Sequence, residues 1–213
     1  YDKTIQKWII NKNINHLLEQ FSNSFNDFKK FGLSPNITRI GGNLSQPILF
    51  QTMDKLGVKV DSTAMPGRHR NDNERSFNWK LTKGHIYKPS FENPQIEMKP
   101  TLNLIEIPFT MFKIKADYDF IPISRYVDFT FNAERVEKAF NTVKIRDNTL
   151  VIILHPSLLI PSNFRDKHGL IEYGLKNFKK NILFLKKYIE KNYGNVRFVS
   201  LKELGKKYNE KEL

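Results

Sequence analysis

Apolar residues recur at helical and at strand spacing along this chain, and the two periods alternate. Apolar side chains three and four residues apart predict helices, and these are expected over 3–31, 45–56, 133–143, 173–193 and 201–208. Short apolar runs bounded by turn-forming residues predict buried strands, and these are expected over 36–40, 58–61, 102–109, 149–155 and 196–199. Strands that alternate with helices predict an α/β fold built on an open sheet or a barrel.

A short strand–helix–strand unit in the first third of the chain indicates parallel strands. Its helix can begin with Ser45 as the cap and Pro47 in the first turn, and Gly57 ends it before the second strand. Such a crossover places two strands side by side in the same direction. The 213 residues supply one ordinary core, so a single domain over 1–213 is expected.

Three polar residues stand at the carboxyl ends of expected strands, where α/β folds place their chemistry. They are Arg39, Asp61 and His155. A carboxylate beside an imidazole fixes its tautomer and stabilises its protonated form, so that the histidine can act as a general acid. Each residue also has an ordinary interpretation: Arg39 as a surface cation, Asp61 as a turn former or helix cap, and His155 as a satisfied core histidine.

The chain is strongly basic and contains no cysteine. Its 35 Lys and Arg against 22 Asp and Glu give a formal charge of +13, which attracts polyanions such as nucleic acid, acidic polysaccharide or an anionic membrane surface. Many of these lysines lie on polar faces of helical patterns, which also suits a solvated surface. No motif that reads bases accompanies them, so nucleic acid is not the expected partner.

Without cysteine, any metal site would need His, Asp or Glu. No apolar run is long enough for a membrane-spanning helix.

Four motifs follow one another along the chain and carry a resemblance to a known family. They are an arginine motif in 32–43, an Asp-Ser motif in 56–63, a Glu-Ile-Pro motif in 104–110 and a histidine motif in 153–156. This series resembles the polysaccharide deacetylases of the NodB-homology type. The resemblance runs from about Phe31 to Leu204 and so covers nearly the whole chain.

The resemblance implies a distorted (β/α) barrel and a metal-dependent hydrolase that removes acetyl groups from N-acetylated sugars of a surface polysaccharide, with zinc as the expected metal. It implies His155 as the general acid, Asp61 as its orienting partner, and Arg39 as the residue that holds the catalytic aspartate. Trp79 and Tyr87, in the long segment 62–100, would stack on sugar rings. The alternative for these two rings is hydrophobic anchoring of that segment.

The amino-terminal motifs of that family, Asp-Asp and His-x-x-x-His, have no counterpart in these residues. His69, His85 and His168 lack a second histidine at three- to five-residue spacing, so no metal ligand is predicted within the chain. The chain is therefore expected to be the carboxyl-terminal part of the barrel without its first strands, and its zinc would depend on a missing amino-terminal segment or on a partner chain. The alternative is a catalytically inactive, deacetylase-like module that binds carbohydrate or protein.

Overall fold

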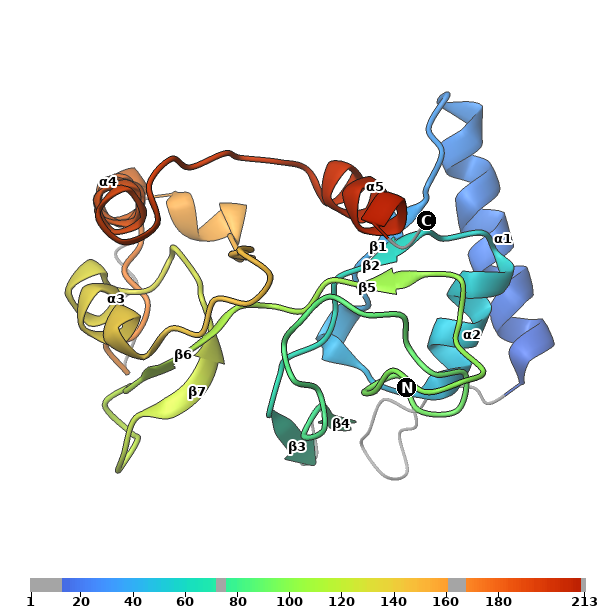
Figure 1. Ribbon diagram of the computed structural model, residues 1–213, viewed down its shortest axis with the longest axis horizontal. Helices are drawn as coiled ribbons and strands as arrows, with labels where there is room; N and C mark the ends of the chain where they lie inside the picture. The colour runs from blue at the N-terminus through green and yellow to red at the C-terminus, as the bar shows by residue number, and fades with distance from the viewer. Residues whose placement is uncertain (1–12, 72–75, 161–167, 212–213) are drawn as a thin grey trace. The chain divides into compact units, whose positions relative to one another are not determined.

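The computed structural model describes residues 13–71, 76–160 and 168–211. The residues gather into two compact units (Figure 1), and the single deacetylase-like domain over 1–213 stays a prediction. The first unit comprises Tyr1–Pro108 and Ser200–Leu213, and the second unit comprises Phe109–Val199. Each unit has its own buried core and is described separately below.

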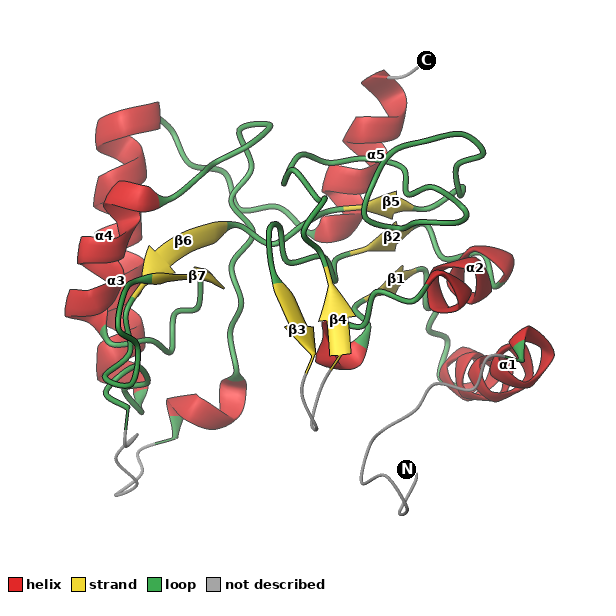
Figure 2. Ribbon diagram, turned by 90° about the horizontal axis from the view of Figure 1, so that it is seen from below, coloured by secondary structure: helices red, strands yellow, loops and turns green. Residues whose placement is uncertain are grey.

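The first unit is built on a three-stranded parallel sheet (Figure 2). Its strands are β1 (Ile37–Thr38), β2 (Val60–Asp61) and β5 (Ile105–Glu106), in the order β1-β2-β5. The helix α2 (Pro47–Lys55) connects β1 to β2. The predicted parallel strand–helix–strand unit is therefore confirmed, although each strand is shorter than the apolar run that predicted it.

The first helix of this unit has a side-chain cap, whereas the predicted cap of the second helix is wrong: α2 follows Gln46 without a side-chain cap, and the Ser45 hydroxyl accepts from the N–H of Asn78 instead. The side chain of Asn13 accepts hydrogen bonds from the backbone N–H groups of Asn15 and His16, and α1 (Ile14–Lys30) begins there. Residues 3–12 of the helix predicted over 3–31 lie outside the described residues. A short 3-10 helix, η1 (Gly41–Asn43), follows β1.

The segment 62–100, predicted as a long loop, also contains a small hairpin. Its strands are β3 (His69–Asn71) and β4 (Ser76–Asn78), which pair antiparallel. No helix in the described part of the chain is long and apolar enough to cross a membrane.

The helix α5 (Leu201–Lys211) packs closely against β2 because Gly205 has no side chain. A Cβ atom at Gly205 would clash with Cγ2 of Val60. In a solvated helix, Gly→Ala stabilises by about 1 kcal/mol. We therefore expect Gly205→Ala to destabilise the protein instead. It should lower the free energy of unfolding by about 1–3 kcal/mol, the usual cost of overpacking. Denaturant unfolding followed by tryptophan fluorescence measures this, with the exposed Lys207→Ala as a control. A stabilised Gly205→Ala variant would contradict the packing.

The second unit is a hairpin covered by helices. Its strands β6 (Met111–Ile114) and β7 (Ile123–Tyr126) pair antiparallel, and the apolar pattern did not predict them. Its helices are α3 (Ala133–Ala139), η2 (Phe140–Thr142), η3 (Pro156–Leu159) and α4 (Leu175–Tyr193). Phe112, Phe140 and Leu185 are buried between them. The predicted helices over 133–143 and 173–193 are thus confirmed.

Two of the predicted strands are wrong as strands. Residues 151–155 are extended, but only one bridge, between Ile153 and Asp128, ties them to a neighbour. Val151 and Ile153 are buried while Leu154 is exposed, so this segment is covered on one face only. Residues 196–199 form no strand, because Phe198 and Val199 are exposed and no described segment pairs with them.

The described residues contain one parallel sheet and two antiparallel hairpins, and no closed barrel is found among them. The distorted (β/α) barrel stays a prediction.

Candidate functional site

The last residues of the three parallel strands form a polar row in the first unit. Thr38 pairs with Asp61 and Asp61 with Glu106, and paired residues of neighbouring strands point to the same face. The hydroxyl of Thr38 donates to Oδ2 of Asp61 over 2.6 Å. Both carboxyl groups are fully buried, which is costly for a charge unless it is paired or hydrogen-bonded.

The hydrogen bonds of this row suit a proton shared by the two carboxyl groups. Oε1 of Glu106 accepts from the backbone N–H groups of Thr63 and Ala64, over 3.0 and 2.8 Å. Oδ1 of Asp61 and Oε2 of Glu106 have no donor among the described residues. Two ionised carboxylates only accept, so one shared proton satisfies both oxygen atoms.

The pKa shifts of Asp61 and Glu106 agree with a shared proton. Burial raises the pKa of Glu106 well above its ordinary range, and the charge of Asp61 raises it further. Burial also raises the pKa of Asp61, but hydrogen bonds from Glu106, Thr38 and Thr63 and the charge of Arg39 oppose the rise. The raised pKa values of both acids thus suit a proton shared between Glu106 and Asp61.

Arg39 follows β1 directly and lies at the same end of the sheet as Asp61. Its Nε donates to the carbonyl oxygen of Ser62 over 2.9 Å, and its Nη2 donates to the Ser62 hydroxyl over 3.3 Å. Burial lowers the pKa of Arg39, while the charges of Asp61 and Glu106 oppose this effect. The parallel strands thus bring Arg39 and Asp61 together as predicted. That Arg39 holds a catalytic aspartate stays a prediction.

His155 lies in the second unit and pairs with a buried acid. Its Nδ1 is 2.8 Å from Oδ2 of Asp128, and the side chains of His155 and Asp128 are 48% and 1% exposed. Oδ1 of Asp128 accepts from the backbone N–H and the hydroxyl of Thr130, over 2.8 and 2.6 Å. Among the described residues, Nε2 of His155 has no hydrogen-bond partner. The imidazole is therefore held at one nitrogen and open at the other.

Strand pairing explains why these two side chains meet. The N–H of Ile153 donates to the carbonyl of Val127, and the N–H of Phe129 donates to that of Ile153. This places Ile153 beside Asp128 in a parallel register. His155 follows Ile153 by two residues and so points to the same side as Asp128.

Asp128, and not Asp61 as predicted, is the carboxylate that contacts Nδ1 of His155. Asp61 lies in the other unit, and its carboxyl group contacts Thr38 and Glu106. The sequence did contain signals for the two acids that were missed as site residues. Asp128 and Glu106 each interrupt an apolar run, and an acid in such a run needs a specific partner.

Trp79 and Tyr87 are buried, which corrects their expected role as sugar-stacking residues. The indole N–H of Trp79 donates to the carbonyl of Asn43 over 2.8 Å, and its ring packs edge-on against Phe50. The Tyr87 hydroxyl donates to the carbonyl of Pro94 over 2.6 Å, and burial raises the pKa of Tyr87 well above its ordinary range. Because each ring is enclosed by the protein, neither has a free face on which a sugar ring could stack. Both rings anchor the segment 62–100, as the alternative had it.

The described residues do not form a metal site by themselves. A zinc site uses three or four His, Cys, Asp or Glu ligands, and no group of three such side chains gathers in the described part of the chain. Zinc would therefore need ligands from outside the described residues.

Comparisons of the chain with protein-family models, with curated proteins and with solved structures gave no match. The resemblance to polysaccharide deacetylases therefore rests on the four sequence motifs.

Proposed function

We propose that this chain is the carboxyl-terminal part of a polysaccharide deacetylase, a metal-dependent hydrolase that removes acetyl groups from N-acetylated sugars of a surface polysaccharide. The observation that supports it most is the pair formed by His155 and Asp128, with a half-exposed imidazole held at Nδ1 by a buried carboxylate. The order of the four motifs along the chain supports it independently.

The pair suits the proton transfer that this hydrolysis needs. Water adds to the carbonyl carbon of the N-acetyl group, the C–N bond breaks, and the leaving amine takes up a proton. Protonated His155 can give this proton from Nε2, since Nδ1 is engaged by Asp128. The carboxylate of Asp128 fixes the direction of the ring and stabilises its protonated form.

Asp61 and Arg39 have a positioning role in this proposal. Asp61 ties β1 to β5 through Thr38 and Glu106, and Arg39 fixes Ser62, the residue that follows Asp61. These contacts shape the end of the parallel sheet. The divalent metal would be held by residues outside the described part of the chain.

The second candidate is a catalytically inactive, deacetylase-like module that binds carbohydrate or protein. The observation that favours it is the lack of a metal-ligand group among the described residues. In this case, the His155–Asp128 pair would contribute hydrogen bonds to a bound glycan.

Acetate release distinguishes the two candidates. The complete natural protein is incubated with N-acetylated chito-oligosaccharides and with peptidoglycan, and free acetate is measured. We expect release that a chelator abolishes and that added zinc restores, since the proposed hydrolysis depends on a divalent metal. Binding of a glycan without any acetate release would favour the module, and neither binding nor release would contradict both.

A further inference from the structure

The connection between β6 and β7 exposes a cluster of large apolar side chains. In this hairpin tip, which we define as residues 118–122, the exposed fractions are 98% for Phe120, 68% for Ile121 and 56% for Tyr118. Pro122 is exposed as well. Single exposed apolar residues are ordinary, but several in one short loop mark an interaction surface.

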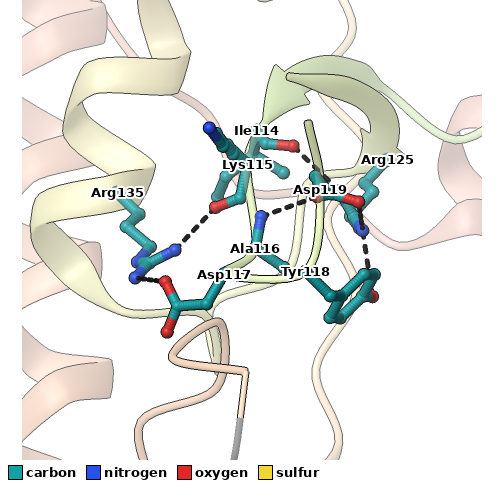
Figure 3. A network of polar contacts seen from close by, with 8 residues as sticks. All are labelled: Ile114, Lys115, Ala116, Asp117, Tyr118, Asp119, Arg125 and Arg135. Atoms are coloured by element: carbon teal, nitrogen blue, oxygen red, sulfur yellow. Dashed lines mark hydrogen bonds and ion pairs between the residues drawn. The ribbon is translucent and has the colours of Figure 1, made fainter. Parts of the chain in front are cut away.

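A nearly buried ion pair holds the hairpin tip in place (Figure 3). Nη1 and Nη2 of Arg125 donate to the carboxylate of Asp119, over 2.8 and 3.2 Å, and the two side chains are only 10% and 6% exposed. Arg125 also donates to the carbonyl of Ile114 and to the hydroxyl of Tyr118, over 2.8 and 3.0 Å. Such forked pairs combine strength with fixed geometry.

The ionisation of Asp119 agrees with a hairpin tip that the ion pair holds in place. Burial acts to raise the pKa of Asp119, but hydrogen bonds from Arg125 and from the N–H of Ala116 outweigh it and lower the pKa. Asp119 therefore stays ionised and paired. Because the loop is already ordered, its exposed side chains lose little conformational freedom on binding.

The charges around the hairpin tip leave a positive surplus. Asp117 pairs with Arg135 over 2.6 Å, and Arg135 also donates to the carbonyl of Lys115 over 2.8 Å (Figure 3). Both acids of the loop are thus matched by arginines. Lys113 and Lys115 on the same hairpin are exposed and add positive charge.

We propose that the hairpin tip binds an anionic membrane surface by inserting Tyr118, Phe120 and Ile121 among the lipid headgroups. Aromatic residues are favoured at this depth, and apolar area with neighbouring lysines is what binds proteins to anionic lipid surfaces. The formal charge of +13 adds long-range attraction to the same surface.

The composition and size of the tip favour lipid over other partners. Ile121 and Pro122 have no flat aromatic face to stack on a sugar. A standard protein interface needs about 800 Å² from each partner, more than this short loop can supply, whereas lipid places no such requirement on area.

Vesicle sedimentation tests the proposal. The full-length protein is sedimented with vesicles of phosphatidylcholine alone and with added phosphatidylserine, at about 0.1 and about 0.5 M salt. We expect binding to the anionic vesicles that weakens with salt. The double change Phe120→Ser and Ile121→Ser should lower the binding constant about tenfold or more, since it removes most of the apolar area. Phe198→Ser, an exposed phenylalanine elsewhere in the second unit, is the matched control and should keep wild-type binding.

Circular dichroism and thermal unfolding establish that each variant is folded before it is compared. Failure of the folded wild-type protein to sediment with anionic vesicles would overturn the proposal, as would equal binding by the double variant. Loss of glycan binding in the double variant with vesicle binding intact would overturn it in favour of a sugar platform. His155→Ala should not alter vesicle binding, so this result is independent of the proposed hydrolysis.

Discussion

His155→Ala is expected to lower the rate of acetate release about 10²- to 10⁴-fold, the usual contribution of a general acid. The reason is that alanine has no imidazole to give a proton to the leaving amine. The side chain is half-exposed, so its removal should leave the fold intact. His69→Ala, which removes an exposed imidazole from β3, is the matched control and should keep wild-type turnover.

Asp128→Asn should act through the same imidazole. If Oδ1 keeps its bonds from Thr130, the new amide nitrogen faces Nδ1 of His155 and donates to it. The ring is then driven to the tautomer with its proton on Nε2, and the protonated ring loses its counter-charge. Turnover should fall, and the double variant should be about as slow as His155→Ala alone because the two residues act as one unit.

One measurement separates this role from a merely structural one. The nitrogen chemical shifts of His155 should report the changed tautomer even where no turnover is measured. Unchanged turnover in His155→Ala, or losses that multiply independently, would leave His155 as a surface residue.

Local signals predicted the parallel core of the first unit because each of them acts over a few residues. Pro47 sets the first turn of α2, and Gly57 ends the connection to β2 with the positive φ that favours glycine. The two strands then had to run parallel, which brought Arg39 and Asp61 to one end of the sheet. This much of the candidate site was predictable.

The partners of the site residues were not predictable, since they depend on pairing between distant segments. Asp128 meets His155 only because Ile153 pairs in parallel with the residue that follows Val127. The hairpin of β6 and β7 that leads to Asp128 has a long turn without an Asn-Gly or Asp-Gly signal. Trp79 was placed in a loop by its neighbours, yet tertiary packing against Phe50 buries it.

A change in the first unit should alter how stability depends on pH. Glu106→Gln keeps an oxygen that accepts from Thr63 and Ala64, and its amide can donate to Asp61 where the shared proton now lies. It therefore preserves the hydrogen bonds without a titrating group. Glu106→Ala removes them and leaves Asp61 buried without its partner, which should lower the free energy of unfolding by about 3–5 kcal/mol.

The direction of the pH effect follows from the raised pKa of Glu106. In the unfolded chain this carboxyl group loses its proton near pH 4.3, to within about a unit, whereas in the folded protein burial and the charge of Asp61 keep the proton bound to higher pH. Its stabilising contribution is complete below the unfolded pKa and is lost as the pH rises through the folded pKa. Over that interval, one proton changes the free energy of unfolding by up to about 1.4 kcal/mol per pH unit.

Glu106→Gln should consequently gain stability relative to the wild type as the pH rises, and the difference should level off above the folded pKa. Trp79 is buried in the first unit, so tryptophan fluorescence during urea unfolding at a series of pH values follows the unit that contains Glu106. Glu92→Gln, at an exposed position, should track the wild type at every pH. A difference that stays constant with pH would mean that Glu106 shares no proton. A relative gain as the pH falls would mean that both acids are ionised, and the row of Thr38, Asp61 and Glu106 would then need a cation in place of the proton.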